Sequence, residues 1–201
     1  YSSTSSMVAS LLMSSDFGMS SRVATALAFG IKTDTLGFTR NFNAVDVRAL
    51  LWINAWVDKE KLRAIEMPPR SIEALDSFAT ALNNKVHLDR IILAPVHNLV
   101  NRDSLAQIAD FLLPTEGVDT VVAFGIRRNK VILSARSNNS NIHVGKLLST
   151  NFPEGLAGGH KSLGGGQIPF NVITNQNNDV EEYDHNLIMD ETLKLLQGIF
   201  C

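Results

Sequence analysis

The chain has 201 residues, of which 45% are hydrophobic and 19% charged, and its formal net charge is −2. This composition is typical of a globular protein of one or two domains with a substantial core. It disfavours a dedicated duplex-DNA binder, because such proteins concentrate positive charge and this sequence has no basic block. Small anionic ligands stay compatible with it, since one pocket can be basic within a nearly neutral chain.

The sequence has no apolar run near the roughly 18 residues that span a membrane, and no signal-peptide pattern. Its single cysteine is Cys201, so no disulfide can form within the chain, as is typical of reducing compartments. We therefore expect a cytoplasmic protein with no membrane partner. The first six residues are Ser-rich and include no initiator methionine, and we interpret the chain as a piece of a longer protein.

The first third of the chain is predicted to be helical. Apolar residues recur at helical spacing over 6–30 with a weak break, and Gly30 is expected to end this region. A long helix is predicted over 44–66, and Pro68 and Pro69 would stop it. These two prolines are the best candidate for an interdomain hinge.

The remainder of the chain alternates between helical and strand patterns, which predicts an α/β domain with a mixed sheet. The expected helices are 72–82, one opening with a capping box at Ser104 and Gln107, 142–148 and 185–199. The expected strands lie within 86–96, at 119–126 and at 131–135, with a hairpin turn at 127–130. The polar stretch 175–184 is expected to be mobile.

The most informative segment is the glycine-rich stretch 155–169, which places His160 between two groups of glycines. Glycine lets the backbone approach a ligand closely and adopt positive φ, and successive free N–H groups bind anions. A histidine in such a loop can donate a hydrogen bond to a phosphate or carry a proton. Composition alone leaves a flexible surface loop as the alternative.

Two further segments carry polar groups suited to phosphate chemistry. Arg136 and Ser137 end a predicted strand, where the guanidinium can bind a phosphate bidentately and the hydroxyl can add a donor. Asp34 lies between two threonines near a predicted helix end, and carboxylate oxygen suits Mg²⁺ or Mn²⁺. The alternatives are a solvated surface turn for Arg136 and an N-cap or Asx-turn for Asp34.

Several common catalytic patterns are missing from the sequence. It contains no H-E-x-x-H, C-x-x-C or G-x-S-x-G motif, and no G-K-[ST] closes the glycine-rich stretch. The histidines other than His160 show no metal-ligand spacing. Zinc-peptidase, zinc-ribbon, α/β-hydrolase and Walker A interpretations are therefore excluded.

Taken in order, these segments resemble the DHH phosphoesterase superfamily. Residues 30–38, Gly-Ile-Lys-Thr-Asp-Thr-Leu-Gly-Phe, are similar to its last metal-binding motif, and 3–12 to the Ser/Thr-rich helix before it. Arg136-Ser137 followed by Gly158-Gly159-His160 is similar to the DHH-associated domain, although the glycine-rich stretch is a variant. Its form is most similar to the exopolyphosphatase-related branch, which lies near the oligoribonuclease-like proteins.

The resemblance implies an α/β fold in two parts. Residues 1–57 would be the C-terminal remnant of a parallel-sheet catalytic domain, and 58–70 the interdomain linker. Residues 71–201 would be the smaller DHH-associated substrate-binding domain with its mixed sheet. The role of segment 171–201 stays open.

The resemblance also implies a division of roles among the candidate residues. Substrate phosphate would be bound by Arg136, Ser137, Gly158, Gly159 and His160, with His160 also taking a catalytic role. Asp34 would be one ligand of a two-metal Mn²⁺ or Mg²⁺ site. The family's Asp-x-Asp and Asp-His-His motifs, which supply most metal ligands, are absent from the chain.

We therefore expect the C-terminal part of a metal-dependent phosphoesterase that is inactive by itself. The parent would hydrolyse esters or anhydrides of small nucleotides, short oligonucleotides or polyphosphate. The alternative is a non-catalytic module that binds a phosphate or nucleotide and regulates attached domains. The expected partner is a phosphate-containing small molecule or short single-stranded nucleic acid, and Trp52 and Trp56 leave a homodimer open.

Overall fold

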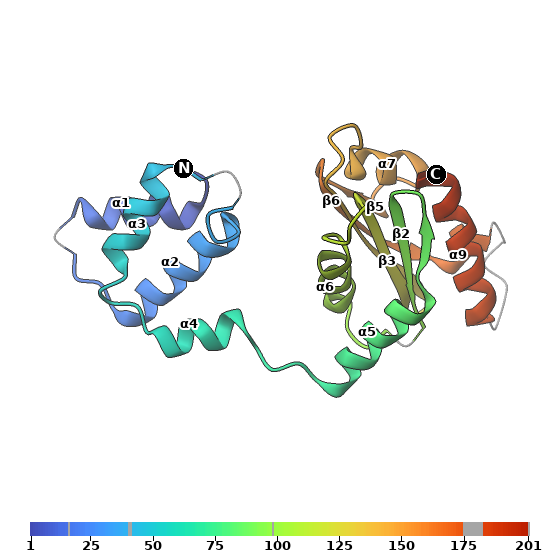
Figure 1. The fold of residues 1–201 in the computed structure, drawn as a ribbon, viewed down its shortest axis with the longest axis horizontal. Coiled ribbons are helices and arrows are strands. Elements are labelled where there is room, and N and C mark those ends of the chain that lie inside the picture. The colour runs from blue at the N-terminus through green and yellow to red at the C-terminus, as the bar shows by residue number, and fades with distance from the viewer. Residues whose placement is uncertain (16, 40–41, 98, 175–182, 201) are drawn as a thin grey trace. The chain divides into compact units, whose positions relative to one another are not determined.

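The computed structural model describes residues 1–15, 17–39, 42–97, 99–174 and 183–200. The chain forms two compact units, Tyr1–Pro69 and Arg70–Cys201, and their boundary falls at the predicted hinge (Figure 1). Cys201 and most of the polar stretch 175–184 lie outside the described residues. Among the residues described, no helix is long and apolar enough to cross a lipid bilayer.

The first unit is built from short helices whose first turns are capped by side chains. They are α1 (Thr4–Met13), α2 (Ser21–Asp34), α3 (Ala44–Ile53) and α4 (Lys59–Glu66), capped by Ser3, Ser20, Asn43 and Asp58. Their core is small and rich in alanine, which lets the helices approach closely. Gly30 also serves this approach, because a Cβ there would collide with Ser5 of α1.

Two predictions for this unit are corrected by the structure. Helix α2 continues through Gly30 to Asp34 instead of ending at the glycine. The long helix predicted over 44–66 is broken into α3 and α4, because Asp58 caps a new helix and its N–H donates to Thr25 Oγ1 of α2 at 3.0 Å.

Helix α4 belongs to the first unit rather than to a linker beginning at residue 58. Glu66 of α4 forms an ion pair with Lys32 of α2, and Leu62 packs against the core of the unit. The connection between the units is thereby reduced to the few residues around Pro68 and Pro69.

The second unit contains a six-stranded mixed sheet with strand order β1-β2-β3-β4-β6-β5. The strands are β1 (Val86–Leu88), β2 (Ile91–Val96), β3 (Thr120–Arg127), β4 (Lys130–Ser137), β5 (Ala157–Gly159) and β6 (Leu163–Pro169). Strands β2 and β3 are parallel, and every other neighbouring pair is antiparallel. The predicted α/β fold with a mixed sheet is confirmed.

Helices cover both faces of this sheet. Successive side chains of β3 point to opposite faces, and nearly all of them are apolar and buried, so both faces have to be covered. Val121 and Ala123 face α5 (Ile72–Asn84) and α6 (Asp103–Leu112), whereas Val122 and Phe124 face the opposite core. That core is closed by α7 (Val144–Asn151), α8 (Phe170–Thr174) and α9 (His185–Phe200). Figure 1 shows the sheet between α6 on one side and α9 on the other.

The glycine-rich stretch forms the hairpin β5–β6 and is not a loop. At some glycines of β6, neighbouring atoms occupy the space that a side chain would need. A Cβ on Gly164 would press on Val144 and Leu148 of α7, and one on Gly166 would press on Ala157 of β5. The glycines therefore let α7 and β5 approach β6 closely.

Of two local predictions for the second unit, the hairpin turn is confirmed and the capping box is wrong. The hairpin between β3 and β4 turns at Arg128 and Asn129, both with positive φ (49° and 57°), as the sequence predicted. The predicted capping box is not formed, because the N-cap of α6 is Arg102, whose side chain makes no capping hydrogen bond. Ser104 lies inside the helix and is buried.

Candidate functional site

An open pocket of about 740 Å³ lies on the α6 side of the sheet, above β4, β6 and β5. The start of α6 forms one wall through Arg102 and Asp103, and the strands form the floor. The residues that line the floor include Lys130, Ser134, Gly158, Gly165 and Gly166.

Three floor residues lie side by side across three strands, with Ser134 opposite Gly165 and Gly165 opposite Gly158. A Cβ built on Gly158 would meet no atom within 4 Å, and its φ is an ordinary one. Packing therefore does not require glycine at this position. A missing side chain above an open pocket exposes backbone to a ligand, which is the use of glycine that the sequence suggested.

Gly159 is glycine for a structural reason. Its φ is +150°, and a Cβ there would collide with Leu163 O and with Gly164 Cα. The two predicted phosphate-binding glycines thus differ. Gly158 lines the pocket, and Gly159 shapes the hairpin beside it.

Arg136 of β4 is held by hydrogen bonds next to this floor. Its Nε donates to Asp110 Oδ1 of α6 at 2.6 Å, and its Nη1 donates to Ser134 Oγ at 3.1 Å and to Ala135 O at 3.0 Å. Its side chain is 19% exposed. Within the described residues its Nη2 donates to no group, so a fixed guanidinium retains a free donor edge for an anion.

Ser137 belongs to the interior of the unit. It is 2% exposed, and its hydroxyl exchanges a hydrogen bond with Thr120 Oγ1 at 2.9 Å and accepts the N–H of Asn139 at 3.1 Å. The predicted role as a donor to substrate phosphate is therefore not supported. Ser134, which lies on the opposite face of β4 from Ser137 and on the same face as Arg136, is the serine that accepts a hydrogen bond from the guanidinium.

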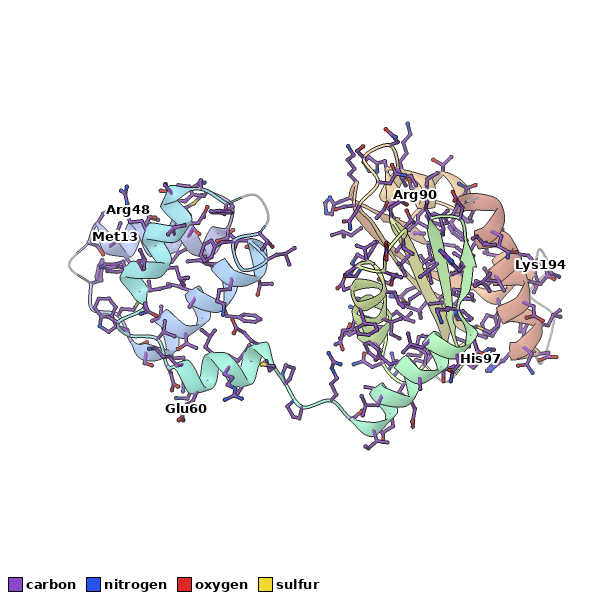
Figure 2. All side chains as sticks on the ribbon, viewed as in Figure 1. Met13, Arg48, Glu60, Arg90, His97 and Lys194 are labelled. Carbon is purple, nitrogen blue, oxygen red and sulfur yellow. The ribbon has the colours of Figure 1, made fainter. Side chains whose placement is uncertain are left out.

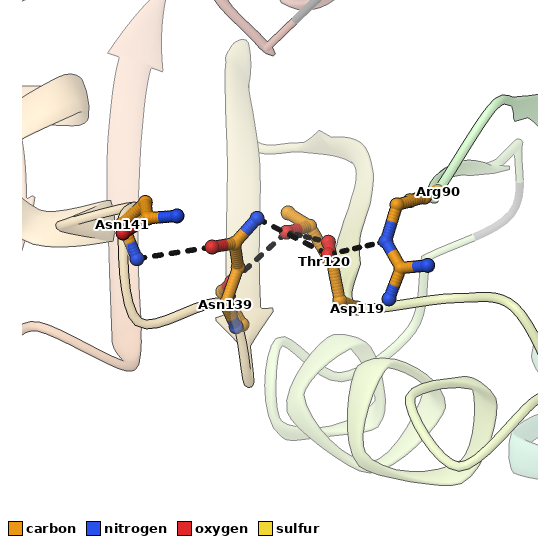
Figure 3. Close-up of polar contacts among 6 residues, drawn as sticks. Arg90, Asp119, Thr120, Asn139 and Asn141 are labelled. Atoms are coloured by element: carbon orange, nitrogen blue, oxygen red, sulfur yellow. Dashed lines mark hydrogen bonds and ion pairs between the residues drawn. The ribbon is translucent and has the colours of Figure 1, made fainter.

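Ser137 is part of a polar network that fixes the segment after β4 (Figure 3). Asp119 accepts hydrogen bonds from Arg90 Nε (2.8 Å), Thr120 Oγ1 (3.0 Å) and Asn139 Nδ2 (3.1 Å). Burial acts to raise the pKa of Asp119, and these bonds outweigh it and lower that pKa. The network ties together the segments before β2, before β3 and after β4, and it occupies the Ser137 hydroxyl.

His160 lies exposed in the turn between β5 and β6. Its backbone N–H donates to Leu163 O at 2.7 Å, and its carbonyl accepts the N–H of Gly145 at 2.9 Å. Lys161 O accepts the N–H of Val144 at 2.9 Å, so loop carbonyls satisfy the first turn of α7. The anion nest that the glycines suggested is not open at this helix end, and the candidate group is the imidazole.

Asp34 is the last residue of α2 and is exposed. A carboxylate is unfavourable at this end of a helix, where the dipole is negative. Leu36, Gly37 and Phe38 follow with φ of 46°, 63° and 68°, a conformation that costs roughly 1–2 kcal/mol for each residue other than glycine. Neither an N-cap nor an Asx-turn explains Asp34, and strain of this kind concentrates at functional sites.

The described residues contain no group of three or more His, Cys, Asp or Glu side chains that could hold a metal ion. Asp34 lies in the first unit, whereas Arg136 and His160 lie in the second. Within the second unit, Ser134 and Gly158 line one pocket, and Arg136 adjoins it through its hydrogen bond to Ser134 without lining it. Sequence reasoning missed Ser134, which its spacing of two from Arg136 on one strand could have revealed, and Asp110, which no local signal marks.

Residues 83–184 match the DHHA1 domain family. The chain belongs to this family. Its resemblance to the C-terminal region of DHH phosphoesterases is thereby confirmed, and the matched DHHA1 segment contains Arg136, Gly158 and His160.

Two relatives of this DHHA1 chain define how much of a larger protein it spans. An uncharacterized protein of Methanocaldococcus jannaschii is 34% identical over 171 residues, which are 85% of this chain and 35% of that protein. An exopolyphosphatase-related protein from Bacteroides fragilis has the same fold with a TM-score of 0.70, at 18% identity, over 98% of this chain and 57% of that one. The chain therefore spans about a third of one relative and just over half of the other.

Proposed function

We propose that this chain is the phosphate-binding part of a divalent-metal-dependent phosphoesterase. The carrying observation is Arg136, whose guanidinium is fixed by Asp110 and by Ser134, a residue of the glycine-floored pocket, and whose Nη2 bonds no other described residue. A planar donor fork that needs no reorganisation is well suited to a phosphate oxygen pair. Gly158 then lets the same phosphate rest against the backbone.

In this proposal the second unit positions the substrate and offsets its charge. Arg136 binds the phosphate, and Lys130 adds positive charge at the floor of the pocket. His160 donates a hydrogen bond to the phosphate from the turn that joins β5 to β6. The substrates are esters or anhydrides of small nucleotides, short oligonucleotides or polyphosphate, each of which presents a phosphate to these groups.

Asp34 fits one position of a Mn²⁺ or Mg²⁺ site, because its carboxylate is exposed at a helix end that does not favour it. When bound, a pair of such ions would activate water for in-line attack on phosphorus. One carboxylate is too few for this purpose. The remaining ligands are proposed to come from a part of the protein outside this chain.

The surface of the first unit supports this division. Its helices and turns leave large apolar side chains in solvent, with Phe17 76%, Leu51 72% and Leu11 66% exposed. Exposed apolar surface, where it is contiguous, marks a face that another protein or domain covers. We propose that the first unit is the remnant of a larger catalytic domain and that the chain alone does not turn over phosphoesters.

The direct test is titration of the 201-residue chain with AMP, followed by NMR at the Gly158 amide. Wild type and Arg48→Gln, an exposed control in the first unit, are expected to bind equally. Arg136→Gln is expected to weaken binding by about tenfold, the effect of losing a charge-assisted bond. If Arg136→Gln folds normally and binds AMP with unchanged affinity, the proposal is wrong.

A regulatory binding module is the outcome to separate from this enzyme. A longer natural form of the protein that binds AMP through Arg136 but shows no Mn²⁺-dependent hydrolysis would establish the module. Hydrolysis that is lost in Asp34→Asn, with AMP binding retained, would establish the enzyme.

A further inference from the structure

A second pocket of the DHHA1 unit gathers basic side chains from three separate segments. It has a volume of about 380 Å³ and is lined by His97 after β2, Arg127 and Arg128 at the β3–β4 turn, and His185 at the start of α9. Figure 2 shows His97 beyond the end of β2. None of these residues lines the glycine-floored pocket.

Among the described residues, no acidic side chain lines this second pocket. The described lining contains no Asp or Glu, and none of its four basic residues forms an ion pair with another described residue. Asp184 adjoins His185 in sequence, but it does not line the pocket, and its carboxylate accepts the N–H of Asn186 at 2.8 Å. Such a cluster is unexpected in a chain with a net charge of −2, because like charges repel unless an anion joins them.

Two of the side chains are oriented by their neighbours. Arg127 Nε donates to Val100 O at 3.1 Å, which leaves its terminal nitrogens unbonded within the described residues. The His185 ring packs edge-on against Phe170 with centroids 5.8 Å apart. A pocket whose donors are already oriented loses less entropy when a ligand binds.

Arg128 is the residue that the fold explains least. It occupies the first turn position with a φ of +49°, where Asn, Asp or Gly is preferred, and its side chain is exposed. An arginine at this position costs backbone energy without any packing in return. An anionic ligand that binds the Arg128 guanidinium would explain why arginine occupies this turn position.

We propose that this second pocket, formed by His97, Arg127, Arg128 and His185, is a separate binding site for a phosphate-only oligoanion such as pyrophosphate. Among its described lining residues the only aromatic rings are those of the two histidines, and they lack the larger stacking platform for nucleobases that single-stranded nucleic acid sites use. The forked guanidinium groups match tetrahedral oxyanions instead. Val100 lines this site and Arg102 lines the glycine-floored pocket, and no described residue lines both.

The test exploits the turn itself. Pyrophosphate is titrated into the 201-residue chain without divalent metal, and the amides of Asn129 and Gly158 report on the two pockets separately. Arg128→Asn removes the charge but supplies a preferred turn residue, so its melting temperature is expected to equal or exceed that of wild type. Its pyrophosphate affinity at Asn129 is expected to fall about three- to tenfold.

Controls distinguish a specific binding site from general charge attraction. Arg48→Gln is expected to leave pyrophosphate affinity unchanged. His185→Gln, like Arg128→Asn, is expected to lower that affinity. Equal losses in Arg48→Gln and Arg128→Asn, or a response at Gly158 alone, would overturn the proposal. Tighter binding of a single-stranded oligonucleotide than of tripolyphosphate at Asn129 would overturn the choice of ligand.

Discussion

Arg136 of β4 and Asp110 of α6 are joined by a hydrogen-bonded ion pair of 2.6 Å across 26 residues of sequence. The carboxylate takes Nε, the inner donor of the guanidinium, and Ser134 takes one Nη1 hydrogen. The pair therefore sets the direction of the remaining donor edge. A residue with the same charge but another shape cannot reproduce this arrangement.

Replacing Arg136 with lysine tests whether shape or charge binds the ligand. A lysine ammonium can reach either Asp110 or the phosphate but lacks the planar fork that serves both. We expect Arg136→Lys to lose most of the affinity lost by Arg136→Gln, about tenfold by calorimetry with AMP. Near-wild-type affinity in the lysine variant would mean that charge alone suffices.

The two neighbouring glycines of β5 give a matched pair of variants. Gly158→Ala adds a methyl group into open space, so the melting temperature should stay within a few degrees of wild type while AMP affinity falls. Gly159→Ala places Cβ against Leu163 O at a φ of +150° and is expected to cost about 2 kcal/mol or more of unfolding free energy. Full AMP affinity in Gly158→Ala would show that no ligand approaches that backbone.

Asp46 links the start of the chain to α3 and gives the first unit an acid-sensitive element. It is fully buried, and it accepts the N–H groups of Asn43 at 2.9 Å and Ser2 at 3.3 Å. Burial acts to raise the pKa of Asp46, but hydrogen bonds from Ser2, Ser6 and Asn43 outweigh it and lower that pKa from 3.8 to about 2. The folded state thus binds this proton less readily than the unfolded state.

The sign of the pH effect follows from this lowered pKa. The stabilising contribution of Asp46 is complete above pH 3.8 and is lost as the pH falls towards 2, because the unfolded state takes up the proton first. Asp46→Asn should lower the unfolding free energy of the first unit by about 2 kcal/mol at pH 7 and flatten its dependence between pH 4 and 2. Glu60→Gln, an exposed control, should do neither.

Both tryptophans lie in the first unit, so their fluorescence reports its unfolding separately from that of the second unit. Trp52 packs against the core, and its ring centroid lies 5.3 Å from that of Trp56, which is 40% exposed. The homodimer that these rings left open stays a prediction. A concentration-dependent shift of this fluorescence in the 201-residue chain would support it.

Leu36 offers a test of the strained turn that follows Asp34. Its φ is 46° and its side chain is 55% exposed, so glycine would relieve backbone strain and lose little packing. We expect Leu36→Gly to raise the unfolding free energy of the first unit by about 1 kcal/mol. If Asp34 acts as a metal ligand, the same variant should loosen its position and weaken Mn²⁺ binding in a longer natural form of the protein.

The sequence predicted those elements whose signals are local. The β3–β4 turn and α9 carry their own turn residues and apolar periodicity, and both are found close to the predicted positions. Strands β5 and β6 were missed because glycines have no side chains with which to show a period of two. The break between α3 and α4 depends on a contact with Thr25, 33 residues away, which no local pattern encodes.

The candidate site divides in the same way. Arg136 and Gly158 could be named as candidates because guanidinium and glycine chemistry can be read from residue type. The interior position of Ser137 depends on its pairing with Thr120 across the sheet, and that register was not available from sequence. Asp110 and the cluster around Arg128 were missed for the same reason, since each is assembled by packing of distant segments.

The carbonyl groups of His160 and Lys161 hold the first two N–H groups of α7, and this has a consequence for motion. Any displacement of the histidine turn breaks bonds that the helix cannot replace from within itself. The backbone that carries the imidazole is therefore fixed before a ligand arrives, so binding has to order only the side chain. A segment whose composition allowed a flexible surface loop is instead anchored to a helix.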